Sequence, residues 1–129
     1  MKAVPAALAM LLLTGQASAA SVDGIWGVAR GDAAVCLGVH VIVLRDGRYT
    51  KAMLDVGTTL GPRDMVVSTA GYAFDGARVV VSPSLSFAQP EPRQVYRWDA
   101  ATGILLREEP APTLTYRRCP DRPLRPLER

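Results

Sequence analysis

Hydrophobic residues after residue 20 fall into short runs, in which they often occupy every second position, and no sustained period of 3.6 residues is present. The runs are rich in Val, Leu, Ile, Tyr and Thr and are separated by Gly, Pro and Asp, as is typical of short strands joined by turns. The pattern predicts an all-β fold of about eight strands. The predicted strands are Ile25–Arg30, Leu37–Leu44, Arg48–Asp55, Met65–Phe74, Arg78–Val81, Gln94–Trp98, Ile104–Glu108 and Thr113–Arg118.

The turns indicate how these strands are connected. Asp46-Gly47 and Asp75-Gly76 each lie between two β-prone runs, and the Asp-Gly pair tolerates the positive φ angles of a tight hairpin. A third, longer turn ends at Gly103. Because each turn joins neighbouring runs, the sequence favours an antiparallel up-and-down meander. Such a meander closes into a barrel or, as the alternative, packs as a β-sandwich.

Alternation along each strand predicts which side chains face the core. The strand Leu37–Leu44 is unusual because its second face, with Gly38, His40, Ile42 and Leu44, is also largely apolar. This second face predicts either a covering segment or an interaction surface. The residues predicted to face the core are Trp26, Val28, Val39, Val41, Val43, Val79, Val81, Tyr96, Trp98, Ile104, Leu106, Leu114 and Tyr116.

Two segments do not fit the alternation. Prolines at 83, 90 and 92 surround Leu85 and Phe87, so we expect no regular strand there. The two apolar side chains of this segment either plug one end of the domain or form a lid. Residues 120–129 are rich in Pro and Arg and are expected to form a flexible tail.

The first 19 residues have the features of a secretory signal peptide. Lys2 precedes an apolar run that extends to Leu13, and the segment ends in Ala17-Ser18-Ala19, an A-x-A cleavage site. The run is too short to span a bilayer, and no cysteine stands at the cleavage point to carry a lipid. We therefore expect a periplasmic or secreted protein without a membrane span, with a signal peptide over 1–19, one β domain over 20–119 and the tail over 120–129.

Charge and cysteine content narrow the partners and the compartment. Removal of Lys2 with the signal peptide lowers the formal net charge from +3 to +2, and several of the remaining arginines lie in the tail. The folded part has no clustered basic face, so nucleic acid is not an expected partner. In an exported chain the two cysteines, Cys36 and Cys119, predict a structural disulfide.

Gly24-Ile25-Trp26 at the start of the first strand, followed by a meander that ends in "TYRRC", resembles the lipocalin-like (calycin-type) pattern. In that family a G-x-W motif opens the first strand, and its Trp packs at the closed end of an eight-stranded barrel against an Arg near the end of the last strand. The resemblance implies structural roles for Gly24, Trp26 and Arg118, with Arg117 as the alternative arginine. A guanidinium stacked on an indole gains cation–π attraction and shields the ring.

Candidate chemistry is sparse. His40 is the only histidine, which argues against a multi-histidine metal site and leaves single-histidine ligation with carboxylates as the alternative. No serine lies in a nucleophile-elbow context. No two carboxylates are placed together for acid–base catalysis. We expect no enzyme activity, no metal and no cofactor. Arginines 93, 97 and 107 either line a barrel mouth that attracts an anion or are solvated strand residues.

These observations favour an exported, non-enzymatic β-barrel that binds a small, partly apolar molecule in its interior. The expected ligand-binding residues are Tyr72, Phe74, Tyr96 and Trp98, with Phe87 as a possible lid. The alternative is a packed barrel that acts as an interaction module. Its loops or its Gly38–Leu44 face would then bind another envelope protein, as hydrolase inhibitors do. The sequence leaves the oligomeric state open.

Overall fold

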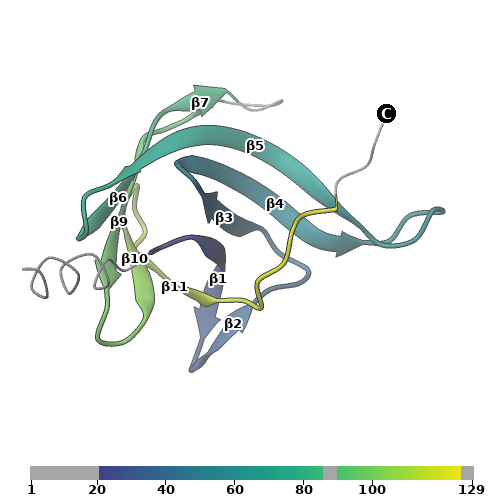
Figure 1. The fold of residues 1–129 in the computed structure, drawn as a ribbon, viewed down its shortest axis with the longest axis horizontal. Helices are drawn as coiled ribbons and strands as arrows, with labels where there is room; N and C mark the ends of the chain where they lie inside the picture. Colours follow the sequence, from purple (N-terminus) through teal and green to yellow (C-terminus); the bar gives the residue numbers. More distant parts are fainter. Residues whose placement is uncertain (1–20, 86–89, 126–129) are drawn as a thin grey trace, which may run out of the picture.

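The computed structural model describes residues 21–85 and 90–125 of the 129-residue chain. All regular elements of this part are β-strands (Figure 1). They are β1 (Gly24–Arg30), β2 (Ala33–Val35), β3 (Val41–Arg45), β4 (Arg48–Val56), β5 (Arg63–Phe74), β6 (Arg78–Val81), β7 (Ser84–Leu85), β8 (Pro90–Glu91), β9 (Gln94–Asp99), β10 (Ile104–Glu109) and β11 (Leu114–Arg118).

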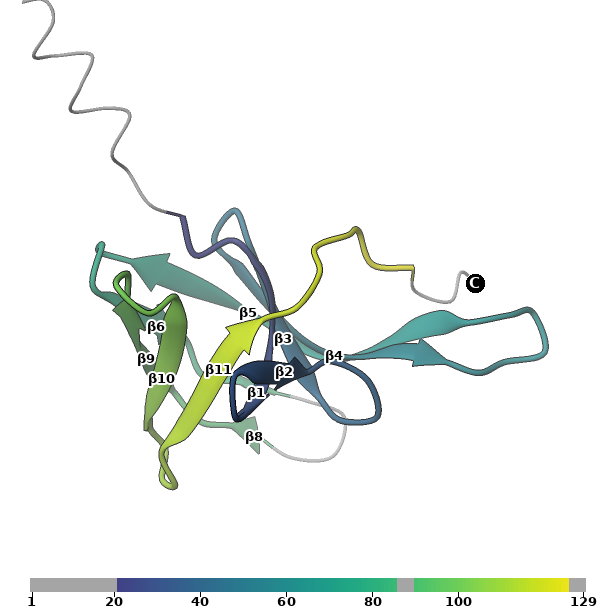
Figure 2. The ribbon, with the colours of Figure 1, turned by 90° about the horizontal axis from the view of Figure 1, so that it is seen from below.

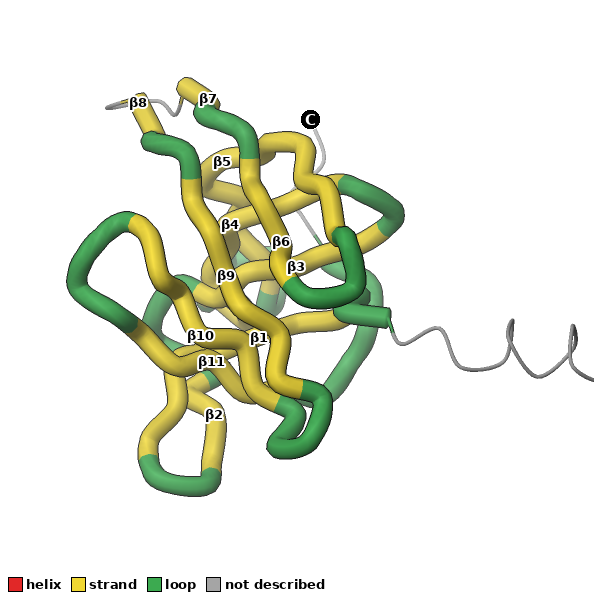
Figure 3. Tube along the Cα trace, turned by 90° about the vertical axis from the view of Figure 1, so that its left-hand side faces the viewer, coloured by secondary structure: helices red, strands yellow, loops and turns green. Residues whose placement is uncertain are grey.

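Eight of these strands form a closed antiparallel barrel. The order is β11-β10-β9-β6-β5-β4-β3-β1, and β1 pairs with β11 to close the sheet. Figure 3 shows the short β7–β8 pair continuing β6 and β9 at one end, while β2 pairs with the second half of β1. The predicted all-β meander and its closure into a barrel are confirmed, and the β-sandwich alternative is wrong.

The hairpin turn at Asp46-Gly47 has the geometry that its sequence predicts. Both residues have positive φ angles, 48° and 81°, as a two-residue primed turn requires. Two predictions about the positions of strands were wrong. The strand expected from Leu37 begins only at Val41, because the chain first forms β2 and crosses back to the barrel. The proline-rich segment does contain β-structure, since Ser84 pairs with Glu91 and Leu85 with Pro90.

One end of the barrel is closed by Trp26. Its ring is fully buried, and it meets Trp98 edge-to-face at a centroid distance of 5.8 Å. The guanidinium carbon of Arg118 lies 4.4 Å from the centre of the Trp26 ring. Arg118 also donates hydrogen bonds to the carbonyl oxygens of Asp23 and Ser21, both 2.8 Å long, and so holds the entering chain across the end of the barrel.

The structure explains why residue 24 is a glycine and why Arg118, rather than Arg117, stacks on Trp26. Gly24 has a φ of 145°, and a Cβ atom there would come within 2.8 Å of the Arg118 Nη1 atom. Arg118 is the registered partner of Trp26 across the closing pair of strands. Arg117, the alternative, donates instead to the carbonyl oxygen of Gly31. The stack expected between Trp26 and Arg118 is therefore present.

The face assignment is wrong in two strands. On β10, Leu105 is fully buried opposite Trp98 and Tyr116, whereas Ile104 and Leu106 are only partly buried. Ile104, Leu105 and Leu106 are all apolar, so the sequence does not show which of them point into the barrel. The pairing of β10 with its neighbouring strands decides this.

The second error concerns β3 and the residues before it. Ile42 and Leu44 face the interior of the barrel, Val41 and Val43 belong to a separate cluster outside it, and Val39 is 41% exposed.

The outer cluster lies beneath the chain that follows β11. Ile25, Val41, Val43, Ala52 and Leu54 pack with Cys119, and Leu124 is packed against them. Cys119 forms the predicted disulfide with Cys36. We call residues 119–125 the C-terminal strap; it runs from β11 toward the hairpin of β4 and β5, which projects beyond the barrel (Figure 2). β3 is therefore buried on both faces, by the barrel interior and by the strap.

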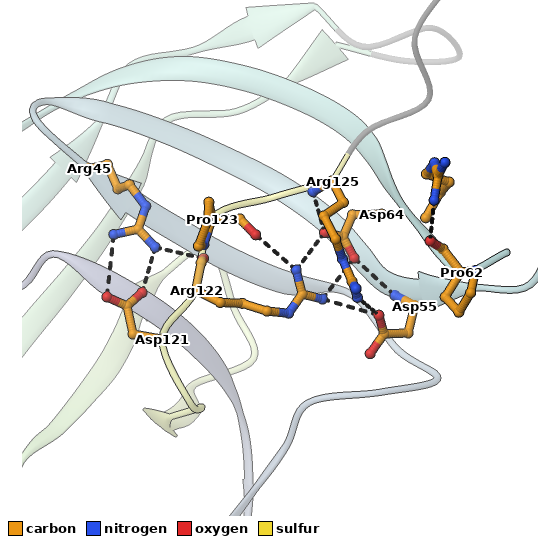
Figure 4. A network of polar contacts seen from close by, with 9 residues as sticks. Arg45, Asp55, Pro62, Asp64, Asp121, Arg122, Pro123 and Arg125 are labelled. Atoms are coloured by element: carbon orange, nitrogen blue, oxygen red, sulfur yellow. Dashed lines mark hydrogen bonds and ion pairs between the residues drawn. The ribbon is translucent and has the colours of Figure 1, made fainter.

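Charged residues fasten the strap to the hairpin (Figure 4). Asp64 is 2% exposed and accepts hydrogen bonds from both terminal nitrogens of Arg122, at 2.7 and 2.9 Å, and from the backbone N–H groups of Asp55 and Arg125. The Arg122 guanidinium holds the pKa of Asp64 well below its usual range. Asp55 pairs with both arginines. A flexible tail was expected from residue 120, whereas residues 120–125 are tied down; residues 126–129 lie outside the described part.

Arg118 and Arg117 offer a matched pair of substitutions. We expect Arg118→Gln to lower the free energy of unfolding by about 1–3 kcal/mol, because it removes the cation–π stack and two charge-assisted hydrogen bonds. Arg117→Gln should cost about 1 kcal/mol or less, because this partly buried arginine loses only one hydrogen bond to a backbone carbonyl. Denaturant unfolding of the two variants would measure the difference, and equal losses would show that the Trp26 stack does not stabilise the barrel.

Asp64 can be tested in the same way. Asp64→Asn should destabilise the protein by about 2 kcal/mol, because it leaves Arg122 without its buried anionic partner. The lowered pKa means that this stabilisation is present above about pH 4 and is lost as the pH falls further, so the variant should show a weaker acid destabilisation than the parent protein. Asp121→Asn, at the exposed pair with Arg45, is the control and should cost less than about 1 kcal/mol.

Candidate binding cavity

A cavity of about 90 Å³ lies at the end of the barrel opposite Trp26. It is partly open to solvent, and residues from the inner faces of five barrel strands form its wall together with the segments at its rim. The lining residues are His40, Ile42, Tyr49, Lys51, Glu91, Pro92, Gln94, Tyr96, Arg107, Pro110 and Tyr116.

Strand register brings the polar residues of this wall together. Tyr96 on β9 lies opposite Arg107 on β10, and Arg107 lies opposite Leu114 on β11, so the Arg107 side chain shares the inner face with apolar and aromatic residues. Lys51 lies opposite Ile42 between β4 and β3 and is also on the inner face. An inward arginine and an inward lysine are unusual for a small barrel, whose interior is generally filled by apolar side chains.

Tyrosine hydroxyl groups and one amide form the floor of the cavity. Gln94 donates from Nε2 to the Tyr49 hydroxyl at 3.3 Å, and the Tyr96 hydroxyl donates to Gln94 Oε1 at 2.5 Å. Tyr96 also meets Tyr116 edge-to-face at 5.7 Å. Burial raises the pKa of Tyr49 to about 12 and also raises the pKa values of Tyr96 and Tyr116. All three hydroxyl groups are therefore protonated at neutral pH.

Arg107 is the most unusual group of the site. Its Nη2 atom donates to the carbonyl oxygen of Pro112 at 3.1 Å, but its Nε atom is buried and has no hydrogen-bond partner among the residues that the structure describes. Within residues 21–85 and 90–125, no carboxylate forms a salt bridge with Arg107. Its positive charge partly opposes the effect of burial on the pKa values of Tyr96 and Tyr116. The cavity thus contains a cationic donor that no described carboxylate neutralises.

The rim carries a second cation, which is paired. Lys51 Nζ lies 3.3 Å from Glu91 Oε1, and both side chains are more than two-thirds buried. Glu91 belongs to β8 and precedes Pro92, so the short β7–β8 pair supplies one side of the opening. His40, which the sequence shows as the only histidine, also lies at this rim.

The structure separates the residues that the sequence grouped as a ligand site. Tyr96 lines the cavity. Tyr72, Phe74 and Trp98 pack instead against the core that includes Trp26, and the Tyr72 hydroxyl donates to Asp23 at 2.7 Å at the closed end of the barrel. Phe87 lies outside the described residues.

Sequence reasoning missed most of the cavity wall. Tyr49, Lys51 and Gln94 were not identified, although alternation from Tyr96 places Gln94 on the same inner face. Arginines 93, 97 and 107 were indistinguishable in sequence. In the structure Arg93 pairs with Glu109 and Arg97 with Glu108, both at the surface, and only Arg107 enters the cavity. The same alternation would have found it from Leu105, had the phase of β10 been known.

Other kinds of site are not evident in the described part of the chain. No group of three or more His, Cys, Asp or Glu residues there is placed to hold a metal ion. The same residues include no helix of sufficient length and apolar character to cross a membrane.

Comparison with known proteins leaves the family undetermined. No protein-family model, no curated protein and no solved structure matches the chain. The eight-stranded barrel is established by the strand pairing of the structure alone, and the lipocalin-like resemblance stays a prediction.

The buried tyrosines predict how stability depends on alkaline pH. Because burial raises the pKa of Tyr49 to about 12, the folded state keeps its proton while the unfolded state, with a pKa of 10.0, loses it. The contribution of Tyr49 is complete below pH 10 and is lost as the pH rises toward 12, by an amount on the order of 2–3 kcal/mol. Unfolding measurements from pH 9 upward should show a shallower loss for Tyr49→Phe, and parallel curves would contradict the predicted shift.

Proposed function

We propose that this protein is a non-enzymatic binding barrel that holds a small molecule in the cavity lined by Tyr49, Tyr96, Tyr116 and Arg107. The observation that carries the proposal is the contrast between the two ends of the barrel. Trp26, Trp98 and their neighbours fill one end with apolar side chains, whereas the other end retains a cavity in which polar groups converge. Convergent polar groups in a concave site are the usual feature of small-molecule binding sites.

The volume of the cavity limits what it can hold. A cavity of roughly 150 Å³ is known to bind benzene, and this one is smaller, at about 90 Å³. A fatty acid or a haem therefore has no room inside the barrel. The expected ligand is smaller and more polar than the partly apolar molecule that the sequence favoured.

The chemistry of the wall supports binding rather than catalysis. Protonated tyrosines are weak bases at neutral pH, an amide does not titrate, and arginine stays protonated. The carboxylate at the rim, Glu91, is paired with Lys51. These groups can orient and neutralise a ligand, and they lack the adjacent nucleophile and base that covalent chemistry uses.

We also propose export, with residues 1–19 as the signal peptide and the periplasm or the exterior as the destination. The disulfide between Cys36 and Cys119 favours a compartment outside the cytoplasm. The Trp26–Arg118 stack at the closed end supports a lipocalin-like relationship, in which a barrel closed at one end carries its site at the other.

One argument for the alternative, an interaction module for another envelope protein, no longer applies. That argument was that the second apolar face of the Gly38–Leu44 segment would be exposed for binding. Ile42 and Leu44 of this segment fill the barrel interior, and Val41 and Val43 lie beneath the C-terminal strap. Within residues 21–85 and 90–125, the large apolar side chains that remain exposed are Leu37, Val39, Leu60, Met65 and Val66.

Native mass spectrometry of the mature protein, purified from its host's periplasm, tests the proposal together with an NMR screen. We expect a non-covalent adduct of low mass in the native spectrum. Small polar molecules added to the ¹⁵N-labelled protein should cause saturable shifts of amides around Tyr49, Tyr96 and Arg107, while the amides of Trp26 and Trp98 at the closed end stay unchanged.

A variant that fills the cavity is the control. Ile42 lines the cavity, and Ile42→Phe should occupy part of its volume and abolish the shifts while the protein keeps its cooperative thermal unfolding. A bare mass in the native spectrum, together with no saturable shift at millimolar ligand, would contradict a binding function for the cavity.

A further inference from the structure

We infer that the cavity selects a small carboxylate of about two to four carbons, which Arg107 binds through its guanidinium group. The inference rests on the proposed binding function and adds the chemical class of the ligand. It follows from three features of the wall: the unpaired donor, the balance of charge and the size of the space.

The first feature is the hydrogen bonding of Arg107. A guanidinium carries N–H donors in a fixed planar fork; here Nη2 donates to the Pro112 carbonyl oxygen, while the buried Nε has no acceptor in the described part of the chain. A charged donor removed from water without an acceptor is unfavourable. A carboxylate is the acceptor whose geometry and charge best match an arginine edge.

The second feature is the balance of charge around the cavity. The other cations near it have partners: Lys51 pairs with Glu91, Arg93 with Glu109, and Arg97 with Glu108. Arg107 has no carboxylate at salt-bridge distance among the described residues, so the arginine, lysine and glutamate side chains around the site leave one positive charge in excess. One monovalent anion would neutralise it, whereas a divalent anion such as phosphate would meet repulsion from Glu91 at the rim.

The third feature is the size and character of the space. The wall combines the tyrosine hydroxyl groups with the apolar surfaces of Ile42, Pro92 and Pro110. A volume of about 90 Å³ accepts a carboxylate with a short alkyl group but not an aromatic ring. The hydroxyl groups of Tyr49 and Tyr116 are protonated and lie on the same wall, so they can rotate to donate to the second carboxylate oxygen.

The experiment compares acetate with acetamide, which has nearly the same shape and no charge. Amide shifts of the ¹⁵N-labelled protein are followed at constant ionic strength, with acetate, propionate, acetamide and inorganic phosphate titrated separately. We expect saturable shifts at Tyr96 and Arg107 with acetate and propionate. Acetamide should bind at least about tenfold more weakly, since it lacks the charge-assisted hydrogen bond, and phosphate should also bind more weakly because Glu91 repels its second charge.

Variants assign the effect to Arg107. Arg107→Gln should weaken acetate binding at least about tenfold, whereas Arg97→Gln, on the neighbouring strand and facing solvent, should leave it within about twofold of the parent protein. Arg107→Lys keeps the charge but loses the planar fork and should bind with intermediate affinity. If Arg107→Gln fails to fold, the comparison of acetate with acetamide on the parent protein still decides the matter.

The outcomes separate this inference from the function on which it rests. Equal binding of acetate and acetamide at the cavity would overturn the carboxylate while leaving a binding cavity in place. Acetate shifts that persist in Arg107→Gln would overturn the role of Arg107. No saturable shift with any of the four probes would overturn the inference, and the native mass spectrum would then decide whether the cavity binds another class of molecule.

Discussion

The pairing of β1 with β11 is the constraint on which the rest of the molecule depends. It closes the sheet into a barrel, and the same pair of strands carries the two side chains that seal one end of that barrel. Trp26 faces Arg118 across this pair, so the guanidinium that stacks on the indole comes from the strand that completes the barrel. Arg118 then binds the carbonyl oxygens of the entering chain. With that end filled by Trp26, Trp98 and their neighbours, the remaining interior space lies at the other end, where Arg107 and the tyrosines meet.

Much of the fold could be predicted from the sequence, because it depends on local patterns. Alternating apolar residues and Asp-Gly turns indicated the meander, the G-x-W triplet indicated the stack with Arg118, and the two cysteines indicated their disulfide. Alternation failed where it was ambiguous. In Ile104-Leu105-Leu106 every residue is apolar, and only the pairing with β9 and β11 shows that Leu105 is the interior residue. On β3 both faces are apolar because both are buried.

The cavity could not be predicted because its distinctive group, the Arg107 guanidinium, differs from other arginines only in the residues that surround it in the folded chain. Arginines 93, 97 and 107 all lie within or next to predicted strands, and the sequence does not show which of them acquires a glutamate partner in the folded chain. The strap was missed for a related reason. A Pro- and Arg-rich segment is typical of a flexible tail, but buried Asp64 gives Arg122 a fixed partner more than fifty residues away in sequence. Long-range partners of this kind override local composition.

The C-terminal strap has a consequence for how such a protein can diversify. The contacts that hold the molecule together lie in two places: the aromatic stack at the closed end, and the strap with its disulfide and its carboxylate–arginine network. Tyr96 and Tyr116 of the cavity wall share the core cluster of Trp26, but the polar wall residues Arg107 and Gln94 belong to neither anchor. Substitutions of Arg107 or Gln94 can therefore accumulate without loosening either anchor, and the same scaffold is free to exchange one small ligand for another during evolution while its frame stays constant.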